Sequence, residues 1–197
     1  MRALRWIAMA AATATPLVAS AQRIGTIEAG VHAGLISYDS KLGYENGPAI
    51  GGSIGTYIFP RLQAFAEDGI TPTKRAGVTQ KHYPFRTGLL YDIPLSGKWY
   101  LGLGGGYNLD AYPDETTANK YEDGFFGTAK LRVCMKNDWN LSFGGVMDQK
   151  PSPNRQSLDG TSNNMTFRVG ISKFLNGNKE MFGTGRGVCE PAAPPPP

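Results

Sequence analysis

From Thr26 onward, the chain alternates apolar and polar residues with a period of two, which is the side-chain period of a β-strand. In the first segment, Ile27, Val31 and Leu35 share one face, and Glu28 and His32 lie on the other. Seven more segments follow this pattern, and they cover residues 49–59, 62–67, 83–93, 99–110, 125–133, 139–147 and 165–174. The period therefore predicts an all-β chain of eight strands.

The connections between these segments alternate in length. Those after the second, fourth and sixth segments contain only a few residues, whereas the others are long and polar, and residues 68–82 form one of the long ones. Short periplasmic turns at one end and long external loops at the other are typical of an antiparallel, up-and-down transmembrane β-barrel in the bacterial outer membrane. A soluble β-sandwich has no reason to segregate its loops in this way.

Residues 1–21 have the pattern of a secretory signal peptide. Arg2 and Arg5 precede an apolar run, and the segment ends in Ala-Ser-Ala, a small-residue cleavage site. Removing the two arginines lowers the formal net charge from +4 to +2, and no block of Lys or Arg remains that would indicate nucleic-acid binding. The rest of the chain is expected to divide into a barrel over residues 22–175 and a Pro-rich tail over residues 176–197.

After residue 21 the sequence has no run of about 18 apolar residues, which a membrane-spanning helix would need. A membrane-spanning strand needs only about 9–11 residues, of which every second one is apolar. Glycine (26 residues), tyrosine (9) and phenylalanine (9) are abundant, whereas charged residues make up only 18% of the chain. This composition favours strands and tight turns over helices.

The polar faces of the predicted strands carry charges of both signs. An eight-stranded barrel is just wide enough for side chains to fill its interior, and charges buried there need partners. The mixed signs therefore predict an ion-paired lumen, with the members Glu28, Glu67, Arg86, Lys130, Arg132 and Arg168. In the alternative interpretation, a soluble barrel such as a lipocalin, the same charges face water.

Aromatic residues gather near both ends of the predicted strands. Near the short turns lie Phe59, Tyr91, Trp99, Trp139 and Phe174, and near the long loops lie Tyr38, Tyr83, Phe85, Tyr107 and Phe125. Two such belts are expected where a barrel crosses the two interfaces of a membrane. The residues expected to be interfacial include Tyr91, Trp99, Tyr107, Trp139 and Phe174. These belts favour the membrane barrel over the soluble one.

The stretch WYLGLGGGYNLD, residues 99–110, is rich in glycine but does not predict a phosphate-binding loop. A phosphate loop needs its glycines at the start of a helix, in a G-x-G-x-x-G or GK[ST] pattern. Here the period is two, and Gly102, Gly104 and Gly106 fall on the lumen face. We expect these glycines to make room for the long Arg and Lys side chains inside the barrel.

The strand count, the loop alternation, the aromatic belts and the final strand MTFRVGISKF together resemble the small eight-stranded outer membrane barrels, such as the OmpA N-terminal domain and OmpX. The resemblance covers residues 26–175, and the strand ending on Phe174 is similar to the C-terminal assembly signal of that family. The resemblance implies a bacterial outer membrane location, with membrane lipid and lipopolysaccharide as partners.

The tail ends in PAAPPPP, a composition typical of semi-rigid polyproline spacers. It resembles the hinge that joins the barrel of OmpA-like proteins to a peptidoglycan-binding domain. Two interpretations stay open. The tail is either a periplasmic linker to peptidoglycan or to another envelope protein, or a terminal segment without a partner.

The two cysteines, Cys134 and Cys189, form an even pair in an exported chain, which favours a disulfide between them. Both are expected on the periplasmic side, because one ends the sixth strand at a short turn and the other lies in the tail. His32 is expected to be a hydrogen-bonded lumen residue. His82 lies at the outer end of the fourth strand, where a lipid hydrolase could place a histidine near a serine, but the sequence assigns no Ser–His–acid set.

These observations predict a structural or anchoring protein of the cell envelope that is not an enzyme and uses no cofactor or metal. One alternative is a protein that binds surfaces or ligands through its long external loops. Another is a lipid-modifying enzyme with its site at the loop ends. A wide channel is disfavoured because the lumen of so small a barrel is filled.

Overall fold

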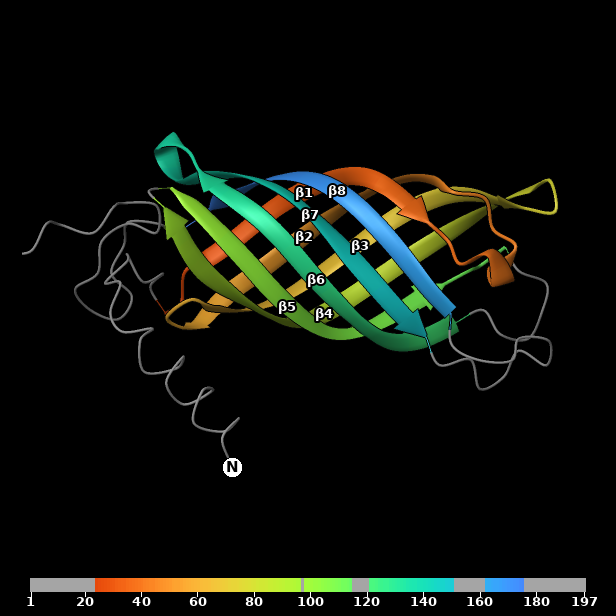
Figure 1. The fold of residues 1–197 in the computed structure, drawn as a ribbon, viewed down its shortest axis with the longest axis horizontal. Coiled ribbons are helices and arrows are strands. Elements are labelled where there is room, and N and C mark those ends of the chain that lie inside the picture. The colour runs from red at the N-terminus through yellow and green to blue at the C-terminus, as the bar shows by residue number, and fades with distance from the viewer. Residues whose placement is uncertain (1–23, 97, 115–120, 151–161, 176–197) are drawn as a thin grey trace, which may run out of the picture.

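The computed structural model describes residues 24–96, 98–114, 121–150 and 162–175, and its strands form one closed antiparallel barrel (Figure 1). The strands in this part of the chain are β1 (Ile27–Ser37), β2 (Gly47–Phe59), β3 (Leu62–Arg75), β4 (Val78–Ser96), β5 (Trp99–Ala111), β6 (Tyr121–Cys134), β7 (Trp139–Lys150) and β8 (Ser162–Phe174). Two 3-10 turns, η1 (Ser40–Leu42) and η2 (Lys136–Asp138), lie between strands. Each strand pairs with the next, and β8 pairs with β1 to close the barrel, which confirms the predicted eight-stranded architecture.

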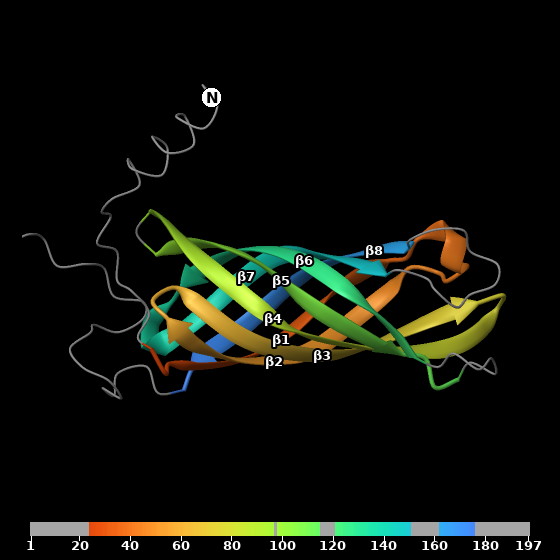
Figure 2. The same ribbon diagram turned by 90° about the horizontal axis from the view of Figure 1, so that it is seen from below.

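The two ends of the barrel differ (Figures 1 and 2). One end, which we call the short-turn rim, carries the start of β1, the end of β8 and the brief β2–β3, β4–β5 and β6–β7 connections. The opposite end, the long-loop rim, carries η1 and the projecting tip of the β3–β4 hairpin. The three short connections that the sequence predicts therefore lie together at one end.

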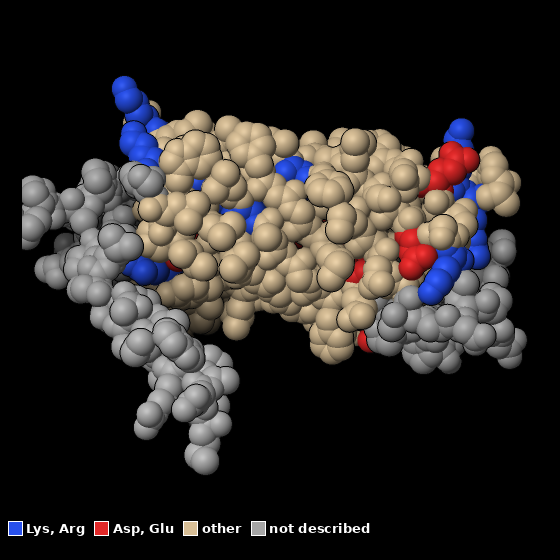
Figure 3. All heavy atoms as spheres, viewed as in Figure 1, with Lys and Arg blue, Asp and Glu red and all other residues tan. Residues whose placement is uncertain are grey.

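The apolar faces of the strands point away from the barrel interior. Val31, Leu35 and Ile50 are at least 60% exposed, whereas Glu67 and Arg86 are at most 5% exposed. In water, burial of apolar side chains drives folding, so this distribution is inverted relative to a soluble barrel. In Figure 3 most charged atoms of the described surface lie toward its two ends, and the band between them is largely uncharged. This exterior is suited to contact with lipid.

The prediction of a long connection at residues 68–82 is wrong. β3 continues to Arg75 and β4 begins at Val78, and the two strands stay paired up to this point. Ala76 and Gly77 both have positive φ angles, 50° and 79°, as in the tight two-residue turns of β-hairpins. Near the tip, backbone hydrogen bonds hold the two strands together, so the strands need no apolar face there. The apolar period in the sequence therefore ends before the strands do.

The glycines of β5 serve two purposes rather than the single one predicted. A Cβ atom on Gly102 would lie 3.2 Å from Cγ of Lys130, so this glycine leaves room for a lumen side chain. A Cβ atom on Gly106 would instead overlap the carbonyl oxygen of Thr87 on β4, and Gly104 has a similar conflict with a β4 carbonyl. These two glycines allow β5 to lie close to the backbone of β4.

Candidate functional site

The lumen is filled by layers of polar and aromatic side chains. In the layer nearest the short-turn rim, Arg132 on β6 contacts Glu28 on β1 and Asp92 on β4, at 2.8 Å each. The Tyr57 hydroxyl donates to Asp92 at 2.6 Å, and the Arg132 guanidinium lies 6.0 Å from the ring centroid of Phe174. Because Arg132 is only 3% exposed, its charge is compensated by these carboxylates and not by water.

A second layer lies closer to the middle of the barrel. Arg86 on β4 donates from Nε and Nη2 to the two carboxylate oxygens of Asp148 on β7, at 2.8 and 2.6 Å. Arg86 also contacts Glu67 on β3 at 3.2 Å, and Arg168 on β8 contacts the same carboxylate at 2.7 Å. Two-point contacts of this kind are the strongest form of Arg–carboxylate pairing. The layer joins four strands across the lumen.

Lys130, also predicted to belong to the ion-paired lumen, is placed differently from Arg86, Arg132 and Arg168. Its Nζ atom lies 5.9 Å from the ring centroid of Phe65, and no carboxylate within ion-pair distance is found for it among the described residues. Together with His32, Arg132 and Arg168, it lines an interior cavity of about 40 Å³ between the two layers. A polar cavity of this size has room for a few ordered water molecules.

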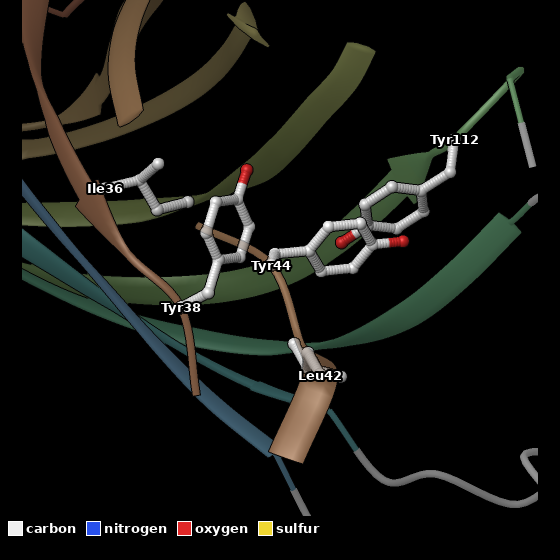
Figure 4. Packing of buried hydrophobic residues seen from close by; sticks show 5 residues of the cluster. All are labelled: Ile36, Tyr38, Leu42, Tyr44 and Tyr112. Carbon is white, nitrogen blue, oxygen red and sulfur yellow. The ribbon is translucent and has the colours of Figure 1, made fainter. Parts of the chain in front are cut away.

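An aromatic plug closes the lumen at the long-loop rim. It consists of Ile36, Tyr38, Leu42, Tyr44 and Tyr112, all at most 7% exposed (Figure 4). The rings of Tyr44 and Tyr112 are stacked with centroids 5.3 Å apart, and Tyr112 also stacks on His82 at 4.7 Å. Burial, followed by the nearby Asp110 carboxylate, raises the pKa of Tyr38 and the pKa of Tyr112 above the usual range. Both hydroxyls therefore stay protonated in the plug.

His82 lies directly beneath the plug and is fully buried. Its Nδ1 atom is hydrogen-bonded to the Tyr38 hydroxyl at 2.8 Å, and its Nε2 atom lies 3.0 Å from a carboxylate oxygen of Asp110. With Tyr112 stacked on the ring, the three side chains hold the imidazole from three directions. A substrate would have to displace the plug to reach this histidine.

The loop between β1 and β2 holds the plug in place. Asp39 accepts hydrogen bonds from the backbone N–H groups of Lys41 and Asn163, both at 3.1 Å, and its own N–H donates to Asn164 at 3.1 Å. The N–H of Lys41 and then that of Asn163 hold the pKa of the Asp39 carboxyl below its usual range. Gly43 follows η1 with a φ of 67°, a conformation that favours glycine.

Part of the outer lumen holds polar atoms without a protein partner in the described part of the chain. Both amide atoms of Asn108 and the hydroxyl of Thr166 are in this state, although these residues are at most 4% exposed. Buried polar groups of this kind are normally satisfied by ordered water. The outer lumen is therefore polar enough to retain water below the plug.

Comparison with known proteins bears on the fold. No family model and no curated protein matches this sequence. The chain is similar to the crystal structure of neisserial surface protein A, with a TM-score of 0.64 and 14% identity over 76% of this chain and 97% of that one. The chain has the fold of the small eight-stranded outer membrane β-barrels.

Two further solved structures resemble this barrel fold more distantly. The N-terminal β-barrel domain of Pseudomonas aeruginosa OprF has a TM-score of 0.46 and 12% identity, covering 75% of this chain and 98% of that one. The outer membrane enzyme PagL has a TM-score of 0.46 and 9% identity, covering 74% of this chain and 98% of that one.

No helix in the described ranges is long and apolar enough to cross a membrane. No group of at least three His, Cys, Asp or Glu side chains that could hold a metal ion is found in the same ranges.

The outer membrane barrel fold places most of the predicted interfacial aromatics on its exterior. Tyr91, Trp99 and Trp139 face outward near the short-turn rim, and Tyr107 faces outward toward the other end, with exposed fractions of 38–45%. The Tyr107 hydroxyl donates to Asp123 at 2.8 Å on this outer surface.

Two predicted belt residues lie inside the barrel. Phe174 is 2% exposed and packs against Tyr57, with ring centroids 6.2 Å apart, and Tyr38 belongs to the plug. The prediction that Phe174 is interfacial is wrong, and the period of two explains why its side chain points inward. Phe167 and Ile171 of β8 point outward, so a residue at an even position such as 174 must point inward.

The predicted charge network omits two of its members. Asp92 and Asp148 are fully or almost fully buried and form the ion pairs described above. Both lie on the inward-facing parity of their strands, as Arg86 does on β4, and the alternation in the sequence already assigns them to the polar faces. The predicted network does not include them because they lie near the predicted strand ends, whereas β4 and β7 extend further.

Cys134 is 4% exposed at the end of β6, beside the short-turn rim. Its predicted disulfide partner, Cys189, lies outside the described residues, as do the predicted signal peptide and the Pro-rich tail. The disulfide and these two boundaries stay predictions.

Proposed function

We propose that this chain is an outer membrane β-barrel protein with a structural or anchoring role in the cell envelope. Its apolar exterior and two aromatic belts support a position across a membrane, with lipid and lipopolysaccharide around it. The fold is that of barrels from bacterial outer membranes, which supports the same location. The N-terminal signal pattern is consistent with export.

The observation that carries a structural role is the filled lumen. Arg132, Arg86 and Arg168 are held by carboxylates in two layers, and the aromatic plug lies above them. A solute that crossed the barrel would have to separate buried ion pairs, each of which costs several kcal/mol to break (about 3–5 kcal/mol). The barrel is therefore better suited to be a scaffold than a conduit.

Two measurements test this proposal. Envelope fractionation combined with heat-modifiable migration in detergent gels should place the full chain in the outer membrane as a folded barrel. In planar bilayers, the folded protein should show no stable conductance like that of a wide channel. Recovery of the protein from the soluble periplasmic fraction would overturn the location, and a sustained conductance would overturn the structural role.

The anchoring part of the proposal concerns residues 176–197. β8 ends at the short-turn rim, so the tail that follows it would start on the periplasmic side. We expect the full chain to sediment with isolated peptidoglycan sacculi and a chain that ends at residue 175 to remain in solution. A Cys134–Cys189 disulfide would hold the tail against the rim, and mass spectrometry of envelope protein with both thiols alkylated would exclude it.

A second candidate function is binding of surfaces or ligands at the long-loop rim. The observation that favours it is the β3–β4 hairpin, whose tip projects beyond the rest of the barrel (Figure 2). Shortening this hairpin should abolish binding to host or neighbouring cell surfaces if the hairpin is the binding element. We propose no enzymatic activity, because His82 is covered by the plug and its contacts are Tyr38, Asp110 and Tyr112.

A further inference from the structure

The two rims of the barrel carry different charge. In the described residues, the short-turn rim carries the cations Arg61, Lys98, Lys136 and Lys173 beside the carboxylate of Asp138. The long-loop rim carries both signs in similar number, among them Asp39, Lys41, Glu45, Lys74, Lys81 and Asp114. Each of the three short turns contributes one cation, and the end of β8 contributes the fourth. The short-turn rim is thus a cationic ring.

Each cation of this ring is close to a lipid-facing aromatic residue, either across the strand pairing or within three residues in the sequence. Lys173 is the register partner of Trp139, and its Nζ atom lies 5.4 Å from the centroid of that ring. Lys98 immediately precedes Trp99, and Lys136 lies three residues before Trp139. Arg61 follows the exposed Phe59 by two residues. Because exposed Trp and Tyr rings sit at the membrane–water interface, the cations lie at the level of the lipid headgroups.

The backbone of these turns is pinned to neighbouring strands. The N–H of Asp92 donates to the carbonyl of Arg61 at 2.8 Å, and the N–H of Cys134 donates to the carbonyl of Lys98 at 2.9 Å. Met135 donates to the carbonyl of Trp139 at 2.7 Å in the third turn. Turns this short and this well fixed keep their cations at the membrane surface, so they do not extend toward a distant polymer.

We propose that the short-turn rim is a binding surface for acidic phospholipids, whose phosphate groups the ring of cations recruits from the surrounding leaflet. The chemistry is electrostatic, because Lys and Arg near a membrane surface attract anionic headgroups and the attraction falls off within a Debye length. The inference rests on the proposed membrane location. It adds a preferred lipid class at one rim, which would hold the barrel at a defined depth and orientation.

Spin-labelled lipids measure this preference in the full chain reconstituted in phosphatidylcholine vesicles. We expect labelled phosphatidylglycerol to associate with the barrel severalfold more strongly than labelled phosphatidylcholine. In the variant K98Q/K136Q/K173Q, the ratio of phosphatidylglycerol association to phosphatidylcholine association should fall to about one. The matched variant K41Q/K74Q/K81Q removes three lysines from the opposite rim and should keep the ratio. Equal association of both lipids with the native protein would overturn the proposal.

Further measurements distinguish the possible reasons for a negative result. If the short-turn variant does not fold, raising NaCl with the native protein should lower the ratio, and a salt-independent ratio would refute the electrostatic origin. If the lysines bind peptidoglycan instead, the short-turn variant will lose sacculus binding while its lipid ratio stays unchanged. A protein that fails to insert into vesicles contradicts the proposed function, whereas an inserted barrel without lipid preference contradicts only this inference.

Discussion

Arg132 on β6 and Asp92 on β4 meet inside the barrel, where Nη1 of the arginine donates to both carboxylate oxygens of the aspartate, at 3.0 and 2.8 Å. β5 lies between these two strands, so no backbone ladder joins them. The same guanidinium donates to Glu28 on β1 at 2.8 Å. Arg132 therefore links three strands through their side chains, and it supplies a constraint that strand pairing cannot.

Replacing this arginine should destabilise the barrel strongly. Arg132→Met leaves Asp92 and Glu28 buried without their cation, and we expect the free energy of unfolding to fall by about 3–5 kcal/mol. Urea-induced unfolding in lipid vesicles measures this change. The variant R132M/D92N should lose less than the sum of its two single variants, because the two side chains interact.

Lys41→Gln is the control for that series, since Lys41 is exposed at the opposite rim. Its free energy of unfolding should change by no more than about 0.5 kcal/mol. A change of similar size for Arg132→Met would show that the lumen pairs do not stabilise the barrel.

Two glycines should differ in their tolerance of the same substitution. Gly106→Ala forces a methyl group against the carbonyl of Thr87 in the β4 backbone, and we expect it to lower the free energy of unfolding by about 1–3 kcal/mol or to prevent folding. Gly127→Ala on β6 meets open space and should be close to neutral. The two variants can be compared directly by the fraction of each that migrates as folded protein in heat-modifiability gels. Equal behaviour of the two variants would contradict the close approach of β5 to β4.

Asp39 should make the loop between β1 and β2 sensitive to acid. Because its folded pKa is lowered, the stabilisation it provides is present above its unfolded pKa of about 3.9 and is lost as the pH falls through the lower folded value. In NMR spectra of the protein in micelles, the amide signals of Lys41 and Asn163 should shift together with pH, with a midpoint below pH ~3.9. In Asp39→Asn both signals should be independent of pH in this range, and a midpoint above the usual value in the native protein would contradict the hydrogen bonds.

His82 should be needed for stability and not for chemistry. His82→Ala removes the ring that stacks on Tyr112 and leaves the Tyr38 hydroxyl without its partner, so we expect a loss of about 1–3 kcal/mol. His82→Asn keeps a polar group of smaller size and should lose less. Unfolding curves give these values. A stability equal to that of the native protein would contradict the role of His82 in holding the plug.

The orientation of the lumen residues could be predicted because it depends on local geometry. Successive side chains of a strand point to opposite faces, so one apolar residue facing lipid assigns the direction of Glu67, Arg86 and Arg132. The same rule would have placed Phe174 inside the barrel, had the parity of β8 been followed to its end. The strand ends were harder to predict, because the β3–β4 hairpin is held by backbone pairing and a two-residue turn and not by apolar residues.

The sequence by itself determined the strand number, the three short turns of one rim and the face on which each charge lies, since all three follow from the period of two and from turn composition. Only the tertiary structure decided which inward charges meet, because the partners come from strands that the tilt and stagger of the closed barrel bring to the same height. This geometry places Arg132 beside Asp92 and Glu28 and leaves Lys130 facing Phe65. It also stacks Tyr112 on Tyr44 within the plug and on His82 beneath it. The alternation of residues selects the interior, and closure of the barrel selects the contacts within it.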